Sequence, residues 1–238
     1  MKYSILLFFS CSLYLNAQIQ LPNAGFELWE APGKTQEPSG WNSFTSASGS
    51  GLAYSLGRTK QIFESDDVRP GSPGKKSLLI VSRSLLGFTV NGTITSGQLN
   101  LGSIKPQSPD NYIITRSNNN AFHQTFNGLP DSIVFWTKFS SKDSSNKAFM
   151  KLIIHDNSNV VDTVKPEKSI HSPIIAQSIA YIIPTHGQWQ RLSIPLEYYN
   201  IQKKPAFILI LFTTNEIPGR GSGADSLFLD DISFIYRH

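Results

Sequence analysis

Residues 221–234 read GSGADSLFLDDISF and predict a β-strand that follows a glycine-rich turn. Alternation along a strand places Phe228, Ile232 and Phe234 on one face, and three apolar side chains mark that face as the one toward the core. Asp230 lies on the same face, so we expect an inward-pointing carboxylate near the end of a sheet. A buried carboxylate is costly unless it is paired, hydrogen-bonded or bound to a metal. The strand therefore predicts both a fold and a candidate site.

Other segments share this β-branched and aromatic character and end in clusters of Gly, Pro, Asn or Ser. With the C-terminal strand they are residues 77–84, 132–139, 149–156, 189–196, 206–215 and 226–236. The run FILILF at 207–212 is apolar on both faces, which predicts a central strand covered on both sides. No long stretch carries an apolar period of 3.6 residues, so any helix should be short. Many short strands separated by turns favour an all-β, antiparallel sandwich or barrel.

Length and charge limit the function classes. The 238 residues include no low-complexity linker, and we expect residues 18–238 to form a single domain. The formal net charge is +4, and the basic residues are scattered, with adjacent pairs only at Lys75-Lys76 and Lys203-Lys204. Because no basic stripe exists, a nucleic-acid partner has little support.

The N-terminal residues 1–17 resemble an export signal. Lys2 precedes a short apolar core, and Ala17 provides a small residue at a cleavage site, so the mature chain should begin at Gln18. The apolar run is too short to cross a bilayer. Cys11, the single cysteine, is then removed; in the alternative, Cys11 is the lipidated first residue of the mature protein. We expect an exported protein, located in the periplasm, on the cell surface or in the medium.

Several short motifs together resemble one protein family. They are N-x-G-F-E-x-W at 23–29, P-x-G-W at 38–41, W-x-K at 136–138, Trp189 with the later Tyr198-Tyr199, and L-x-x-D-D at 227–231. This set is similar to the putative carbohydrate metabolism domain (PCMD) family of secreted Bacteroidetes proteins, and more broadly to jelly-roll carbohydrate-binding modules. The resemblance implies an antiparallel jelly-roll β-sandwich and a carbohydrate partner. Its first strand, at residues 26–29, and its last strand, at residues 227–236, are expected to lie side by side.

The resemblance also implies a structural calcium ion between the two terminal strands. Glu27, Asp230 and Asp231 are the expected carboxylate ligands, and Gly25 would let the backbone approach the ion. The loop before Ser77 is expected to contribute as well. Without a metal, the same aspartates would cap backbone N–H groups or pair with Lys or Arg.

Aromatic side chains are candidates for stacking on sugars. Tyr198, Tyr199 and Tyr54 lie in or near predicted loops, and Trp41 follows a turn, so these four residues are the predicted carbohydrate-binding set. The alternative for each is packing in the core, where most large aromatic residues lie.

Signals for catalysis are weak. The five histidines form no H-E-x-x-H pattern, and no G-x-S-x-G sequence occurs. Acid pairs such as Asp66 with Asp67, or Glu64 with Asp156, are compatible with glycosidase chemistry, but seventeen acids offer such pairs by chance. We predict no catalytic residue and an exported carbohydrate-binding function. The alternatives are a cell-envelope adhesion module with a protein ligand, and a glycoside-active enzyme.

Overall fold

A computed structural model describes residues 18–85, 87–162, 169 and 171–236, so the predicted leader with Cys11 lies outside the described residues. The elements of the first half are η1 (Phe44–Ser46), β1 (Ser48–Gly49), α1 (Gly51–Gly57), β2 (Ile62–Ser65), β3 (Ser77–Val81), β4 (Arg83–Leu85), β5 (Phe88–Val90), β6 (Thr93–Thr95), β7 (Gln98–Leu101) and β8 (Asn111–Ile114). Those of the second half are β9 (Gln124–Thr125), β10 (Ser132–Ser140), β11 (Ala148–His155), β12 (Ile174–Ile182), β13 (Gln190–Pro195), β14 (Glu197–Tyr198), β15 (Phe207–Thr213) and β16 (Ser226–Ile235).

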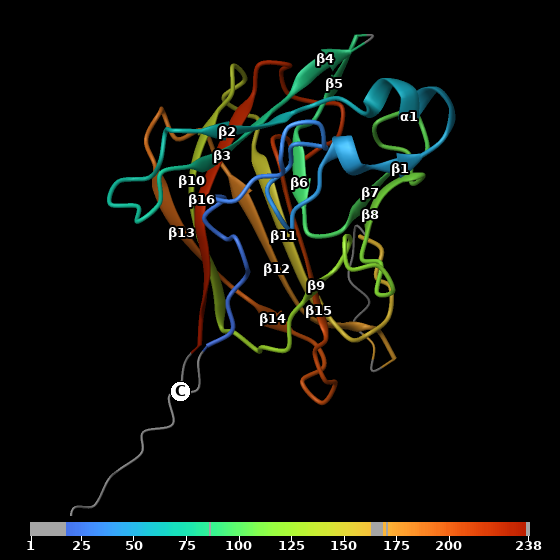
Figure 1. Ribbon diagram of the computed structural model, residues 1–238, viewed down its shortest axis with the longest axis vertical. Helices are drawn as coiled ribbons and strands as arrows, with labels where there is room; N and C mark the ends of the chain where they lie inside the picture. Colours follow the sequence, from blue (N-terminus) through green and yellow to red (C-terminus); the bar gives the residue numbers. More distant parts are fainter. Residues whose placement is uncertain (1–17, 86, 163–168, 170, 237–238) are drawn as a thin grey trace, which may run out of the picture.

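Two antiparallel sheets form the body of the molecule (Figure 1). The five-stranded sheet has the order β13-β10-β16-β3-β2, and the six-stranded sheet has the order β14-β12-β11-β15-β6. Eight of these strands form β13-β10-β16-β3 in one sheet and β12-β11-β15-β6 in the other, and the chain crosses between the sheets as two Greek keys require. The predicted fold class, an all-β jelly-roll sandwich, is therefore confirmed.

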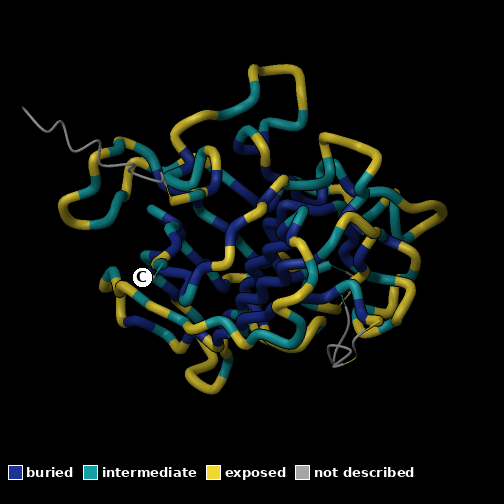
Figure 2. Tube along the Cα trace, turned by 90° about the horizontal axis from the view of Figure 1, so that it is seen from below, coloured by how far each residue is buried: buried dark blue, intermediate teal, exposed yellow. Residues whose placement is uncertain are grey.

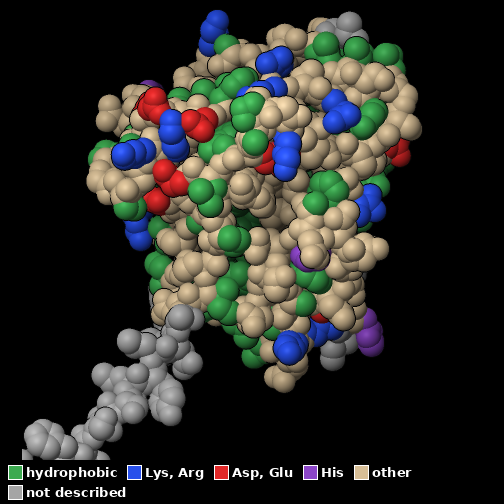
Figure 3. Space-filling view, viewed as in Figure 1, with side chains coloured by type: hydrophobic (Ala, Val, Ile, Leu, Met, Phe, Trp, Pro, Cys, Tyr) green, Lys and Arg blue, Asp and Glu red, His purple; other side chains and the backbone are tan. Residues whose placement is uncertain are grey.

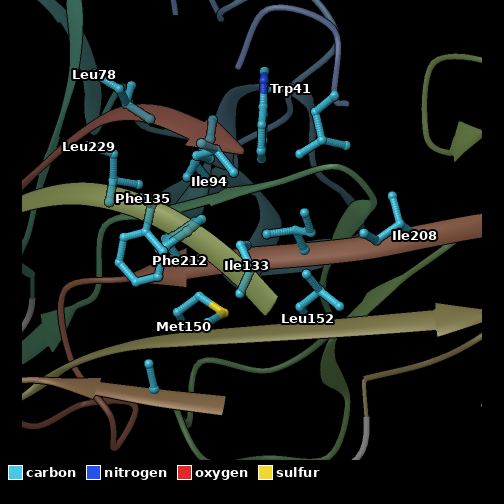
Figure 4. Packing of buried hydrophobic residues seen from close by; sticks show 14 of the residues in the cluster. Trp41, Leu78, Ile94, Ile133, Phe135, Met150, Leu152, Ile208, Phe212 and Leu229 are labelled. Atoms are coloured by element: carbon cyan, nitrogen blue, oxygen red, sulfur yellow. The ribbon is translucent and has the colours of Figure 1, made fainter. Parts of the chain in front are cut away.

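The main core lies between the two sheets. Alternate residues of β10 and β16 meet alternate residues of β11, β12 and β15, and Figure 4 shows how their side chains interdigitate. Phe135 and Phe212 come from opposite sheets, and their rings pack edge to face with centroids 5.1 Å apart. Figure 2 shows this buried centre enclosed by exposed loops. Each fully buried side chain of this size stabilises the fold by about 1.5–3 kcal/mol.

The central strand β15 is covered on both faces, as its sequence predicts. Ile208, Ile210 and Phe212 point into the main core, whereas Leu209 and Leu211 point outward into a second apolar cluster. A small three-stranded sheet, in the order β1-β7-β8, and the turn η1 supply further side chains of this second cluster, and Ile153 of β11 and Ile174 of β12 complete its floor. The outer face of the six-stranded sheet is therefore partly covered.

The prediction of an N-terminal strand at residues 26–29 is wrong. Residues 22–25 form turns, Phe26 has a positive φ of 58°, and only Trp29 makes an isolated bridge, to Pro38. The turns before Phe26 and its left-handed backbone interrupt the extended run that a strand here would need. The segment nevertheless lies against β16, because the amide of Ile232 donates to the carbonyl of Ala24 at 3.0 Å. The prediction that the two ends of the chain meet is confirmed.

The predicted face of Asp230 is also wrong. Two residues of β16, Asp231 and Ile232, oppose the single residue Phe135 of β10, and Asp231 at this β-bulge has a φ of 46°. Because the bulge shifts the alternation, Leu229 and Ile232 point into the core, while Asp230 points to the outer face of the five-stranded sheet.

Candidate functional site

The paired aspartates lie under the N-terminal segment and the loop between β2 and β3. Asp230 is 0% exposed; its Oδ2 accepts the amide of Arg69 at 3.2 Å, and its Oδ1 has no partner among the described residues. Burial raises the pKa of Asp230 to about 6. The side chain of Arg69 binds Asp231 Oδ2 through Nε and Nη2, both at 2.6 Å. Asp231 thus has a basic side chain as its partner, whereas Asp230 has none among the described residues.

Gly25 lies directly against this pair. A Cβ atom at Gly25 would come within 3.1 Å of Asp231 Oδ1 and 3.9 Å of Asp230 Oδ1. The two carboxylate oxygens without an arginine partner therefore lie against the backbone of Gly25, where a Cβ atom would crowd them. This part of the predicted calcium set is brought together.

Glu27, the remaining predicted ligand, has other partners. Its carboxylate accepts the amides of Lys75 at 3.1 Å and Lys76 at 3.0 Å. A side chain at Gly74 would collide with this carboxylate. Glu27 thus fastens the N-terminal segment to the loop before β3, a role that the sequence analysis did not predict for it.

The donor set that remains fits an oxygen-liganded cation only in part. Asp230 and Asp231 offer carboxylate oxygens, the ligand type that calcium prefers, and the orphaned Oδ1 of Asp230 is the group such an ion would satisfy. Within the described part of the chain, no group of three or more His, Cys, Asp or Glu side chains could hold a metal ion. An ion here would depend on backbone oxygens or water for most of its ligands.

Two of the four predicted sugar-stacking residues lie in or against the core. Trp41 is 4% exposed and packs against Phe26, with ring centroids 5.3 Å apart, so its faces are not available to a ligand. Tyr198 packs against the main core, and its hydroxyl donates to the carbonyl of Pro130 at 2.6 Å. Burial raises the pKa of Tyr198 above its ordinary value. Both rings are part of the fold, which corrects their expected place on the surface.

Tyr54 and Tyr199 both pack against the second apolar cluster, on the outer side of the six-stranded sheet. Arg58 lies over the ring of Tyr54 at 5.1 Å and donates to its hydroxyl at 3.0 Å. The hydroxyl of Tyr199 donates to Glu197 at 3.0 Å, and burial raises the pKa of Tyr199 to about 12. Both residues are half-buried.

A cross-strand row that the sequence did not predict lies on the open part of this same face. Tyr181, Phe149 and Thr213 are direct neighbours on β12, β11 and β15, and we call them the aromatic row. Tyr181 is 53% exposed, and its ring centroid lies 5.6 Å from that of Phe149. The ammonium of Lys147 lies 5.6 Å from the ring centroid of Tyr181.

Two buried side-chain oxygen atoms on this face, one in the aromatic row and one four residues from Tyr181 along β12, have unused hydrogen-bonding capacity. The Oγ1 of Thr213 and the Oε1 of Gln177 are buried and have no partner among the described residues. Between their positions lies Lys151, which is 4% exposed and bonds Asp162 at 2.6 Å. Buried polar atoms are nearly always hydrogen-bonded in folded proteins, so each orphan is a place where a ligand or water is expected.

The outer face of the five-stranded sheet carries a second row, formed by Phe63, Leu79, Phe228 and Lys138 on neighbouring strands. The ammonium of Lys138 lies 4.4 Å from the ring centroid of Phe228 and binds Asp67. Asp67 also accepts the indole N–H of Trp189 at 3.0 Å. Burial works to raise the pKa of Asp67, but these hydrogen bonds outweigh it and hold the pKa below its ordinary value. Figure 3 shows acidic and basic side chains mixed over β2 and β3.

Comparisons with known proteins agree on the fold. No family model matches the chain, and no curated protein matches it, so the PCMD resemblance stays a prediction. A solved structure described as a putative glycoside hydrolase from Bacteroides thetaiotaomicron is similar, with a TM-score of 0.63 and 16% identity over 90% of this chain and 71% of that one. A second structure with the same description, from Bacteroides vulgatus, has a TM-score of 0.53 and 11% identity over 90% of this chain and 97% of that one.

A carbohydrate-binding module in complex with β-1,4-galactotriose aligns over 91% of this chain and 97% of that one, with 12% identity and a TM-score of 0.41. Similarity at these identities concerns the fold alone. The two Bacteroides structures, with TM-scores of 0.63 and 0.53, show that this chain shares their fold.

Proposed function

We propose that this protein is an exported, non-catalytic carbohydrate-binding protein that holds a glycan on the open part of the six-stranded sheet. The observation that carries the proposal is the aromatic row: two rings, one of them half exposed, next to a buried hydroxyl without a partner. Ring faces suit the C–H faces of pyranosides, and orphaned oxygens suit sugar hydroxyls.

The ion pairs of the acidic side chains support a non-catalytic role. Glu64 and Asp66 both pair with Lys76, and Asp156 pairs with Lys203. A glycosidase needs one carboxylic acid and one carboxylate on either side of a glycosidic bond. Glu64, Asp66 and Asp156, which the sequence offered for this chemistry, are instead paired with lysines.

Export rests on the leader motif at residues 1–17. Mass spectrometry of the protein recovered from the periplasm or medium should find a mature chain that begins at Gln18. A diacylated chain beginning at Cys11 would establish a lipid anchor in its place. Within the residues that the structure describes, no helix is long and apolar enough to cross a membrane.

The binding test is a glycan array followed by titration of the best glycan. Tyr181→Ala removes one ring of the aromatic row and should weaken binding roughly tenfold, which corresponds to about 1.4 kcal/mol. The free energy of unfolding should change by less than about 0.5 kcal/mol, because the ring is largely exposed.

Phe88→Ala is the matched control, because Phe88 is 50% exposed and lies on the β4–β5 hairpin, outside the row. It should leave binding unchanged. Equal affinity of Tyr181→Ala and Phe88→Ala for the glycan would refute the proposed location, and the failure of every glycan to bind would refute the function.

We further propose a structural calcium ion held by Asp230, Asp231 and the backbone near Gly25, without Glu27. The unpartnered Oδ1 of Asp230 and the closeness of Gly25 support this smaller ligand set. The ion would fasten the N-terminal segment to β16 and stay remote from the glycan.

A further inference from the structure

A cavity of about 440 Å³ opens at the end of β11 opposite to the aromatic row. It is lined by Asp156 and Asn157, which follow β11, and by Lys203, Lys204, Pro205 and Ala206, which precede β15. Its volume lies in the range of about 300–1,000 Å³ that is typical of small-molecule sites. Asp156 follows Phe149 by seven residues along an extended chain, so the cavity lies about 24 Å from the row.

The cavity is lined by two basic side chains and one acidic side chain. Lys203 binds Asp156 at 2.9 Å. Burial works to raise the pKa of Asp156, but the hydrogen bonds from Lys203 and Ser158 outweigh it and hold the pKa below its ordinary value. Lys204 is exposed and makes no ion pair with another described residue. One positive charge therefore remains for a ligand, and basic side chains lie at the lower tip of the molecule in Figure 3.

The walls of the cavity are fixed by the backbone. The amide of Ala206 donates to the carbonyl of His155 at 2.9 Å, and the amide of Asp156 donates to that of Pro173 at 3.0 Å. His155 is buried beneath, between Thr115 at 3.0 Å and the carbonyl of Asp156 at 2.8 Å. A pocket whose walls are already ordered loses little conformational entropy when a ligand binds.

We propose that this cavity binds a sugar acid, a monosaccharide-sized molecule with one carboxylate. Lys204 would pair with the carboxylate, and Asn157 would bond a hydroxyl. Pro205 and Ala206 provide an apolar surface for a C–H face. The site is separate from the aromatic row, so either can exist without the other.

The test is calorimetric or NMR titration of the full mature chain with glucuronate, glucose and acetate. Glucuronate should bind at least fivefold more tightly than glucose, because glucose lacks the charge. It should also bind at least fivefold more tightly than acetate, because acetate lacks the ring. Added salt should weaken the binding of glucuronate, since Lys204 is exposed. Equal binding of glucuronate and acetate would mean that the cavity binds a carboxylate as an adventitious ion only, and it would overturn the proposal. Equal binding of glucuronate and glucose would also overturn it.

Lys204→Gln should weaken glucuronate binding at least fivefold. The matched control is Lys142→Gln, an exposed lysine in the loop before β11, at the other end of that strand, and it should change nothing. Tyr181→Ala should also leave glucuronate binding unchanged, which separates this site from the proposed glycan face. If Tyr181→Ala loses glucuronate binding, or if Lys204→Gln keeps it unchanged, the cavity is refuted as the site.

Discussion

The outer faces of the two sheets carry similar rows of aromatic side chains that differ in how their polar neighbours are satisfied. On the five-stranded sheet, Asp67 binds Lys138 and Trp189, so the loop between β2 and β3 is fastened over the row. The unpartnered Oδ1 of Asp230 on that face lies outside the row, under the N-terminal segment. On the six-stranded sheet, Thr213 and Gln177 keep buried oxygen atoms without a described partner. An aromatic row with a complete set of polar partners stabilises the fold, whereas one with orphaned polar atoms has capacity left for a ligand.

The largest expected effect contrasts a core ring with a surface ring. Trp41→Ala removes a ring that packs on Phe26 and should lower the free energy of unfolding by about 3–5 kcal/mol. Tyr181→Ala should lower it by less than about 0.5 kcal/mol. Urea denaturation of both variants checks this, and similar losses would place Tyr181 in the core and remove the contrast between the faces.

A second prediction concerns acid and the covered end of the six-stranded sheet. Burial lowers the pKa of His155 to about 4, so the folded state holds this ring neutral. The unfolded chain takes up a proton first, near its ordinary pKa of 6.5. Stability is therefore complete above pH 6.5 and falls as the pH drops toward 4, by at most about 3 kcal/mol.

His155→Asn keeps a donor toward the carbonyl of Asp156 and cannot titrate. Its free energy of unfolding should lose much of the pH dependence between pH 6.5 and 4 that the parent protein shows. Parallel curves for the two proteins in urea melts at several pH values would contradict this role of His155.

A third prediction concerns the proposed calcium ion between the N-terminal segment and β16. An ion bound only by the folded state adds about 2.7 kcal/mol at a hundredfold excess over its dissociation constant, which should raise the melting temperature by several degrees. Asp230→Asn should abolish this response, and Glu27→Gln should keep it, because Glu27 binds backbone amides of the loop before β3. Identical melts with calcium and with chelator would exclude the ion.

The smallest of these effects concerns the loop over the five-stranded sheet. Asp67→Asn removes the partner of the largely buried ammonium of Lys138 and should lower the free energy of unfolding by about 1–2 kcal/mol. Glycan affinity should not change, since the loop is on the opposite sheet. A loss of glycan affinity in this variant would mean that the five-stranded face also takes part in binding.

The fold class and most strands of the sandwich could be predicted because apolar patterns are local. The strand β12 was missed, since small residues such as Ala176, Ser178 and Ala180 carry its inner face and give little pattern. The face of Asp230 was wrong because one bulge residue, Asp231, reverses the alternation.

The candidate site was harder to predict, because cross-strand neighbours depend on register between distant segments. Nothing local in the sequence places Phe149 beside Tyr181. One signal was present, however: consecutive residues of a strand point to opposite faces. Tyr198 and Tyr199 therefore could not share a surface, and they pack against the main and the second cluster respectively.

The pairing of both edges of the apolar strand β15 has a consequence for folding. Its run of apolar residues without charge or proline has the composition of segments that stack into amyloid when exposed. In the native fold β11 and β6 pair with its two edges, which prevents such stacking. The contact with β6 joins Thr95 to Ile210 across 115 residues, so this edge is protected only after a long loop has closed. We expect the chain to aggregate most readily before this pairing forms, and a charged residue at Leu209 to reduce aggregation at the cost of the second cluster.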